Sequence, residues 1–197
     1  MKKEFEVIAK IVKNNKRVLD VGCGDGTIME YLKKNQQNDV RGLEPQKNLV
    51  QKCIGKGLSV IEGDAEEELI HFPEKSSDYA VSSQTLQAFL YPEEVLNQLL
   101  RIGKQTIVSI PNFGYWKVRL HLLLKGTMPI TKNLPNDWYN TPNLHMCTIQ
   151  DFVNFCNSKN IKIDKSMCLT NEKISEITNK NMTYKNIFSQ LGIFLIE

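Results

Sequence analysis

The chain has 197 residues, 41% hydrophobic and 24% charged, a composition that is ordinary for a single globular domain. Its 25 basic and 22 acidic residues give a net charge of +3, which is too balanced to predict binding to nucleic acid or to a membrane surface. No apolar run is long enough to span a membrane and no signal peptide is recognisable, so we expect a cytoplasmic protein. The five scattered cysteines form no C-x-x-C pair, which predicts free thiols and no metal site.

Helical and strand patterns alternate through the first 112 residues. Apolar residues from Phe5 to Val12 recur at helical spacing, and a helix beginning at Thr27 has Glu30 at the spacing of a capping box. Further helices are expected after Pro45 and over 92–103. Strands are expected over 17–21, 39–44, 58–64, 77–83 and 105–112. This alternation predicts an α/β fold with a parallel sheet and helices on both faces.

The rhythm breaks over residues 111–148, which hold both tryptophans, four of the seven prolines and two of the three histidines. We interpret this segment as an insert within one domain that spans 1–197. After it we expect a helix over 148–159, a strand over 161–170, a mobile polar loop over 171–186 and a last strand over 187–197.

The stretch VLDVGCGDGT, residues 18–27, places Gly22, Gly24 and Gly26 between the first strand and a helix. A tight turn is the simplest interpretation of such glycines, but the helix that follows also offers unpaired N–H groups and a positive dipole end to a ligand. Glu44 ends the second strand, where ribose hydroxyls are bound in such folds. Asp64 ends the third strand, where it can accept a hydrogen bond from an adenine amino group.

The same stretch argues against phosphorylated ligands. The third glycine comes one residue too early for the dinucleotide pattern G-x-G-x-x-G, and no Walker lysine is present. Asp20 would repel a pyrophosphate but suits a ligand with an ammonium group and a positive sulfur. S-adenosylmethionine has both, so we predict it, or S-adenosylhomocysteine, as the cofactor. The alternative for Asp20 is a capping or turn carboxylate.

Asp20 with the three glycines resembles the first motif of the class I S-adenosylmethionine-dependent methyltransferases. The stretches FPEKSSDYAVSSQTLQAF (72–89) and IVSIPNFGYWKVRLHLLLKGTMPITKNLPNDWYNTPNLHMCTIQDF (107–152), with the loop GLEPQKN, resemble the MetW-type methionine biosynthesis proteins over residues 14–170. One departure is LEPQ at 43–46, where the family commonly has E-I-D. The resemblance implies a Rossmann-like, mostly parallel sheet of about seven strands, the last antiparallel.

The resemblance also implies a role in methionine biosynthesis beside a homoserine O-acetyltransferase. Two functions follow: a small-molecule methyltransferase whose acceptor is unknown, or a non-catalytic accessory subunit that binds S-adenosylmethionine and regulates the acyltransferase. The predicted cofactor-binding residues are Asp20, Gly22, Cys23, Gly24, Gly26, Glu44, Asp64, Ala65, Ser83 and Gln84. The candidate catalytic residues are His145, as a general base, and Tyr139, although His145 is equally consistent with a structural hydrogen bond to the loop backbone.

The insert follows the fifth strand, at the edge of the sheet where ligands of open α/β folds bind, so it can serve as a lid. Within it Trp116, Leu120, Leu123 and Leu124 share one face of a helix. Two interpretations stay open for this apolar stripe: packing against the sheet as part of the core, or docking of the partner enzyme.

Overall fold

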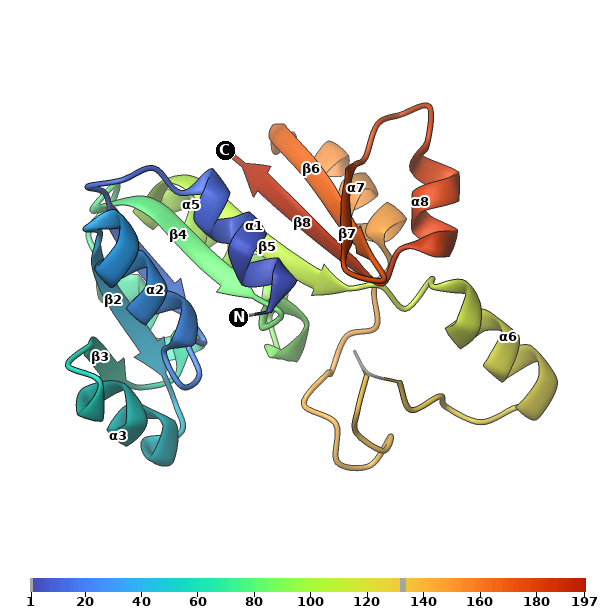
Figure 1. Cartoon of the computed structure of the whole chain (residues 1–197), viewed down its shortest axis with the longest axis horizontal. Helices are drawn as coiled ribbons and strands as arrows, with labels where there is room; N and C mark the ends of the chain where they lie inside the picture. The colour runs from blue at the N-terminus through green and yellow to red at the C-terminus, as the bar shows by residue number, and fades with distance from the viewer. Residues whose placement is uncertain (1, 132–133) are drawn as a thin grey trace.

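The computed structural model describes residues 2–131 and 134–197. In it the chain forms an eight-stranded sheet with helices on both faces (Figure 1). The strands are β1 Arg17–Val21, β2 Asp39–Glu44, β3 Ser59–Glu62, β4 Ser77–Ser83, β5 Gly103–Pro111, β6 Ile163–Thr170, β7 Lys173–Glu176 and β8 Leu191–Ile196. The helices are α1 Lys3–Ile11, α2 Thr27–Gln36, α3 Lys47–Gly55, α4 Ala65–Glu68, α5 Pro92–Ile102, α6 Trp116–Lys125, α7 Ile149–Ser158 and α8 Met182–Phe188, with short 3-10 helices η1 Leu69–His71 and η2 Leu86–Ala88. In the described ranges no helix combines the length and the apolar character that crossing a bilayer requires.

The strand order is β3-β2-β1-β4-β5-β8-β6-β7. Strands β1 to β5 pair in parallel, whereas β8 is antiparallel to both β5 and β6. The chain leaves β1 for β2 on one side of it and later returns to β4 on the other side. The carboxyl ends of β1 and β4 therefore form the topological switch point, where open α/β sheets bind ligands.

Alternating side chains of the strands fill two separate cores. Val18 packs with residues of α1 and α2, whereas its neighbour Leu19 packs with residues of α5 and α7 on the other face of the sheet. The same alternation places Ile107 in the first core and Val108 in the second. Because both faces are covered, the central strands are mostly buried, and most of their buried side chains are apolar, as is typical of parallel sheets.

The predicted parallel sheet with helices on both faces is confirmed, and so is the antiparallel last strand. The prediction of a mobile loop over 171–186 is wrong, because this segment forms β7 and most of α8. Strand β7 pairs with β6 as an antiparallel hairpin, which makes eight strands instead of about seven. Strand β8 begins at Leu191 and not at Ile187, because α8 continues to Phe188.

The insert contributes little to either core. Helix α6 and the loop after it extend away from the sheet beyond the end of β5 (Figure 1). Val118 is the buried residue of α6, while Leu123 and Leu124 are 81% and 72% exposed. Core packing of the apolar stripe is therefore the wrong interpretation. Residues 132 and 133 of the predicted insert lie outside the described residues.

Candidate functional site

The glycine loop after β1 has left-handed backbone at each of its three glycines. Gly22, Gly24 and Gly26 have φ values of 72°, 59° and 72°. A Cβ on Gly22 would lie 2.4 Å from Cγ2 of Thr85, so the glycine allows close packing of the loop on the turn after β4. A Cβ on Gly24 would meet nothing within 4 Å. Gly24 is therefore the loop position whose bare backbone faces open space.

Glu44, at the end of β2, holds the glycine loop in shape. Its side chain is 4% exposed, and Oε2 accepts a 2.9 Å hydrogen bond from the N–H of Gly24. Oε1 accepts a second bond, of 3.0 Å, from the N–H of Gln46. Each carboxylate oxygen has a further lone pair, so Glu44 can also accept from a hydroxyl group.

Asp20 is a buried carboxylate at the end of β1. Its side chain is 2% exposed, and no described residue donates a hydrogen bond to Oδ2. Burial, together with the nearby charges of Glu44 and Glu4, raises the pKa of Asp20 to about 7. A buried acceptor without a donor is costly, so this position is suited to a ligand that brings a positive group.

The start of α2 differs from the prediction. Gly26 is the N-cap residue and Thr27 the first helical residue, so the predicted capping box of Thr27 and Glu30 is wrong. Instead, Oδ1 of Asp25 accepts from the N–H and from the hydroxyl of Thr27, and these bonds hold the pKa of Asp25 below its usual value. The side chain of Cys23 points into the core, where it is buried, and only its backbone belongs to the loop surface.

Asp64 and Ala65 mark the end of the third strand. Oδ1 of Asp64 accepts a 2.9 Å hydrogen bond from the N–H of Glu66 and so caps α4. Ala65 is buried and packs in the core on the α5 side of the sheet. Asp64 is exposed, which leaves its second carboxylate oxygen accessible from outside.

Ser83 ends β4 and Gln84 follows it, beside the glycine loop, and both donate to a residue that sequence reasoning missed. Ser83 Oγ donates to Oε1 of Glu4 at 2.7 Å, and Gln84 Nε2 donates to Oε2. Ser109 Oγ, from β5, also donates to Oε1. Glu4 lies in the first turn of α1 and is 3% exposed. In the sequence, the one feature that points to Glu4 is that an acidic residue occurs among the apolar positions of an amphipathic helix.

A cavity of about 520 Å³ opens beside Glu4 and Gln84. Leu169 and Leu191 line it from the ends of β6 and β8, and Pro135 lines it from the insert. Pro135 therefore brings the insert to this edge of the sheet. The polar residues that line it are Lys2, Lys3, Glu4, Gln84, Asn171, Glu172 and Gln190, so a small molecule in this cavity would meet side chains of both charges.

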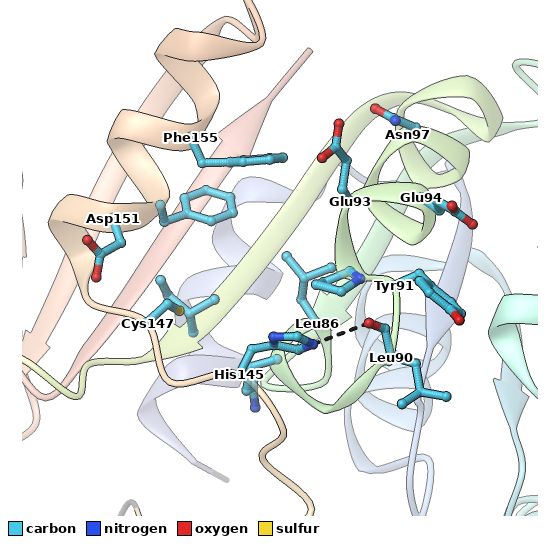
Figure 2. A pocket seen from close by; sticks show the side chains of 14 residues that line it. Leu86, Leu90, Tyr91, Glu93, Glu94, Asn97, His145, Cys147, Asp151 and Phe155 are labelled. Atoms are coloured by element: carbon cyan, nitrogen blue, oxygen red, sulfur yellow. Dashed lines mark hydrogen bonds between the residues drawn. The ribbon is translucent and has the colours of Figure 1, made fainter.

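His145 and Tyr139 lie elsewhere. Figure 2 shows His145 beside η2 and α5, with Nε2 3.3 Å from the carbonyl oxygen of Leu90, in a cavity of about 620 Å³ that Phe155 and Cys147 also line. None of the predicted cofactor-binding residues lines this cavity. Tyr139 is 70% exposed, and its hydroxyl donates to Asp137 at 3.3 Å. The structure thus brings the predicted cofactor residues to one edge of the sheet but leaves both catalytic candidates outside that group.

The chain matches the family model described as "Methionine biosynthesis protein MetW" over residues 2–196. It is 32% identical over 172 residues to the bifunctional methionine biosynthesis protein MetXA/MetW of Rhodopirellula baltica. That alignment covers 82% of this chain and 27% of the relative, so the chain spans about a quarter of the length of the curated relative that it matches.

Solved structures of methyltransferases have the same fold. An S-adenosylmethionine-dependent methyltransferase of Mesorhizobium loti superimposes with a TM-score of 0.71 at 16% identity, over 99% of this chain and 97% of that chain. A possible histamine N-methyltransferase of Thermotoga maritima gives a TM-score of 0.70 at 16% identity, over 98% and 87% of the two chains. At these identities the similarity concerns the fold, which is that of the class I methyltransferases.

Proposed function

Because this chain belongs to the MetW family of methionine biosynthesis proteins, we propose that it binds S-adenosylmethionine at the carboxyl edge of β1, β2 and β4. The main support is Asp20, whose Oδ2 is buried at the switch point without a donor from the described residues. A cationic ligand compensates such a carboxylate, whereas a pyrophosphate would be repelled by it.

Each part of the cofactor has a candidate partner. In this proposal Asp20 faces the ammonium group, directly or through water, and Glu44 accepts from the ribose hydroxyls with its remaining lone pairs. The exposed oxygen of Asp64 accepts from the adenine amino group. Gly24 leaves the space through which the ligand approaches the backbone. When bound, S-adenosylmethionine supplies a methyl group on a positive sulfur.

Transfer of that methyl group requires an acceptor held in line with the sulfur, so positioning is the main task of the protein. The cavity beside Glu4 and Gln84 is our candidate acceptor site, because it adjoins the turn after β4. His145 stays a candidate base, but it would have to release the carbonyl oxygen of Leu90 and reach a different cavity. Tyr139 also stays a candidate, but its exposed side chain would have to leave Asp137 and reach that cavity.

We propose homoserine O-acetyltransferase as the partner. Support comes from the Rhodopirellula relative, whose name joins MetXA and MetW in one chain. The insert is our proposed docking segment, because its exposed apolar residues have no partner in the sheet. These residues are Trp116, Leu120, Leu122, Leu123, Leu124, Ile130, Trp138, Tyr139, Leu144 and Met146. Exposed apolar residues that gather in one segment are typical of protein interfaces.

Charge adds a constraint on the partner surface. No acidic residue occurs between Phe113 and Asn136, while Lys117, Arg119 and Lys125 all lie on α6. The matching surface of the acetyltransferase is therefore expected to be apolar with an acidic rim. This exposed segment favours the second candidate function, an accessory subunit that binds S-adenosylmethionine and adjusts the acetyltransferase without transferring the methyl group.

Calorimetric titration with S-adenosylmethionine and S-adenosylhomocysteine tests the cofactor proposal. We expect dissociation constants well below 1 mM, and failure of both ligands to bind at roughly that level would refute it.

A second experiment separates the two functions. Homoserine acetyltransferase activity is measured with and without this chain, each with and without S-adenosylmethionine, while S-adenosylhomocysteine is quantified. An accessory subunit changes the acetyltransferase rate without producing S-adenosylhomocysteine, whereas a methyltransferase produces it. If neither the rate nor the association of the two proteins changes, the partner proposal is wrong.

A further inference from the structure

Glu4 is a buried carboxylate whose hydrogen-bond donors are all neutral. Ser83 and Ser109 donate to Oε1, and Gln84 donates to Oε2, which leaves Oε2 with an unused lone pair. Among the residues that the structure describes, no lysine or arginine forms an ion pair with Glu4. The nearest basic residue in sequence, Lys3, pairs with Glu6 instead, at 2.9 Å.

Glu4 belongs to a group of three buried carboxylates from three different elements. Asp20 of β1, Glu44 of β2 and Glu4 of α1 are 2%, 4% and 3% exposed. Within the described chain none of the three forms an ion pair, and Oδ2 of Asp20 has no hydrogen-bond donor. Burying negative charge without a counter-ion is unfavourable, so a positive ligand beside these carboxylates would compensate their charge.

Two observations connect Glu4 with the glycine-loop site as well as with α1. Gln84, which donates to Glu4, directly precedes Thr85, and Thr85 packs against the Cα of Gly22. The charge of Glu4 also contributes to the raised pKa of Asp20. Glu4 is therefore bonded to the turn after β4 on which the glycine loop packs, and its charge lies close enough to Asp20 to interact with it.

We propose that Glu4 is a specificity-determining residue of the cofactor site, which makes the site prefer the cationic sulfonium S-adenosylmethionine over the neutral thioether S-adenosylhomocysteine. This inference rests on the proposed cofactor binding. The two ligands share the adenosine and the amino-acid end, so the loop, Glu44 and Asp64 are expected to contribute equally to the binding of both. They differ by one methyl group and one positive charge, and a negative charge near the sulfur favours the charged ligand.

The test is calorimetric binding of S-adenosylmethionine, S-adenosylhomocysteine and sinefungin, whose ammonium group replaces the sulfonium, to the wild type, Glu4→Gln and Glu6→Gln. We expect Glu4→Gln to reduce the preference for S-adenosylmethionine over S-adenosylhomocysteine by about tenfold, with sinefungin following S-adenosylmethionine. Glu6→Gln is the matched control, since it removes the same charge from the partly exposed side of α1. It should leave the preference unchanged within about twofold.

In Glu4→Gln the new amide faces the amide of Gln84, which can destabilise the fold. The pair Gln84→Ala and Glu4→Gln/Gln84→Ala avoids this contact and differs only in the charge of Glu4, so the same loss of preference is expected between them.

Two failures are distinguishable. If the wild type binds none of the three ligands, the proposed function is wrong. If the wild type binds them but either comparison leaves the preference intact, Glu4 is a structural clamp of α1 and this inference is overturned.

Discussion

The backbone N–H of Gly24 donates a 2.9 Å hydrogen bond to Oε2 of Glu44, which joins the loop after β1 to the end of β2. The bond makes the candidate ribose acceptor part of the loop itself. Cys53 of α3 adds a second contact, since its thiol donates to the carbonyl oxygen of Gly24 at 3.3 Å. The loop is thus shaped before any ligand arrives, which lowers the entropy lost on binding.

Replacing Glu44 by Gln should weaken cofactor binding and loosen the loop. The N–H groups of Gly24 and Gln46 bond to different oxygens of Glu44, and an amide keeps only one of these oxygens, so both present bonds cannot be retained. We expect a loss of about 1–3 kcal/mol in binding, seen by calorimetry, and faster hydrogen exchange at Gly24. Unchanged affinity would show that Glu44 does not bind the ribose hydroxyls.

Asp20→Asn should weaken binding of S-adenosylmethionine by about 1–3 kcal/mol and yet stabilise the ligand-free protein at pH 8. Because the folded pKa of Asp20 is raised to about 7, the folded state retains a proton that the unfolded state releases near pH 4. The free energy of unfolding therefore falls as pH rises between about 4 and 7.

The variant lacks this decline. Denaturant unfolding of the wild type and of Asp20→Asn at pH 5 and pH 8 measures the decline. The free energy of unfolding of the variant minus that of the wild type should be larger at pH 8 than at pH 5 by about 1–3 kcal/mol. An equal difference at both pH values would mean that Asp20 is ionised throughout.

Affinity for S-adenosylmethionine should fall as pH decreases below about 7. A positive ligand favours ionised Asp20, so in this range binding must release the proton that the folded protein holds. The decrease is at most about tenfold per pH unit, and titrations in buffers of different ionisation enthalpy will report the released proton. Asp20→Asn should show a nearly flat profile, and a flat profile in the wild type would contradict the role given to this carboxylate.

Gly24→Ala should abolish or strongly reduce cofactor binding at a small cost in stability. Gly57 provides a matched control, because it too has a left-handed φ, of 70°, and no atom within 4 Å of an added Cβ. Both substitutions carry a conformational penalty of about 1–2 kcal/mol, measured by thermal unfolding. Only Gly24→Ala should lower the affinity for S-adenosylmethionine by tenfold or more. Equal binding by the two variants would show that the space at Gly24 is not used by the ligand.

Leu123→Glu should disrupt association with homoserine O-acetyltransferase without affecting the fold. Leu123 is 81% exposed, so its replacement should change the free energy of unfolding by no more than about 0.5–1 kcal/mol. The new carboxylate would meet the acidic rim that we expect on the partner. Ile70→Glu, at a residue 66% exposed outside the insert, is the control. Surface plasmon resonance with the immobilised acetyltransferase measures both, and equal affinities would exclude α6 as the docking element.

The central strands could be predicted from sequence because burial on both faces makes most of their side chains apolar, and the predicted bounds of β1 agree with the structure. Strand β7 could not, because its polar residues match those of a loop and only pairing with β6 makes it a strand. Glu4 was missed for a related reason. An acidic residue in the first turn of a helix is normally solvated, and its burial depends on Ser83 and Ser109, which lie about 80 and 100 residues away in the chain.

The apolar stripe of α6 shows the limit of periodicity. The spacing of Trp116, Leu120, Leu123 and Leu124 identifies a helix with one apolar face, but it carries no information on what covers that face. Likewise, the proximity of His145 and Tyr139 in the sequence did not predict their positions in space. His145 lies beside η2 and α5 because the N–H groups of Leu144 and His145 both donate to the carbonyl oxygen of Gln87.

The position of β8 between β5 and β6 has a consequence for how the chain folds. About 80 residues separate Pro111 from Leu191, its partner in the ladder, so this pairing closes a very large loop and is expected to form late. Until then the edge of β5 is exposed, and folding intermediates of the protein are open to aggregation through that edge during refolding.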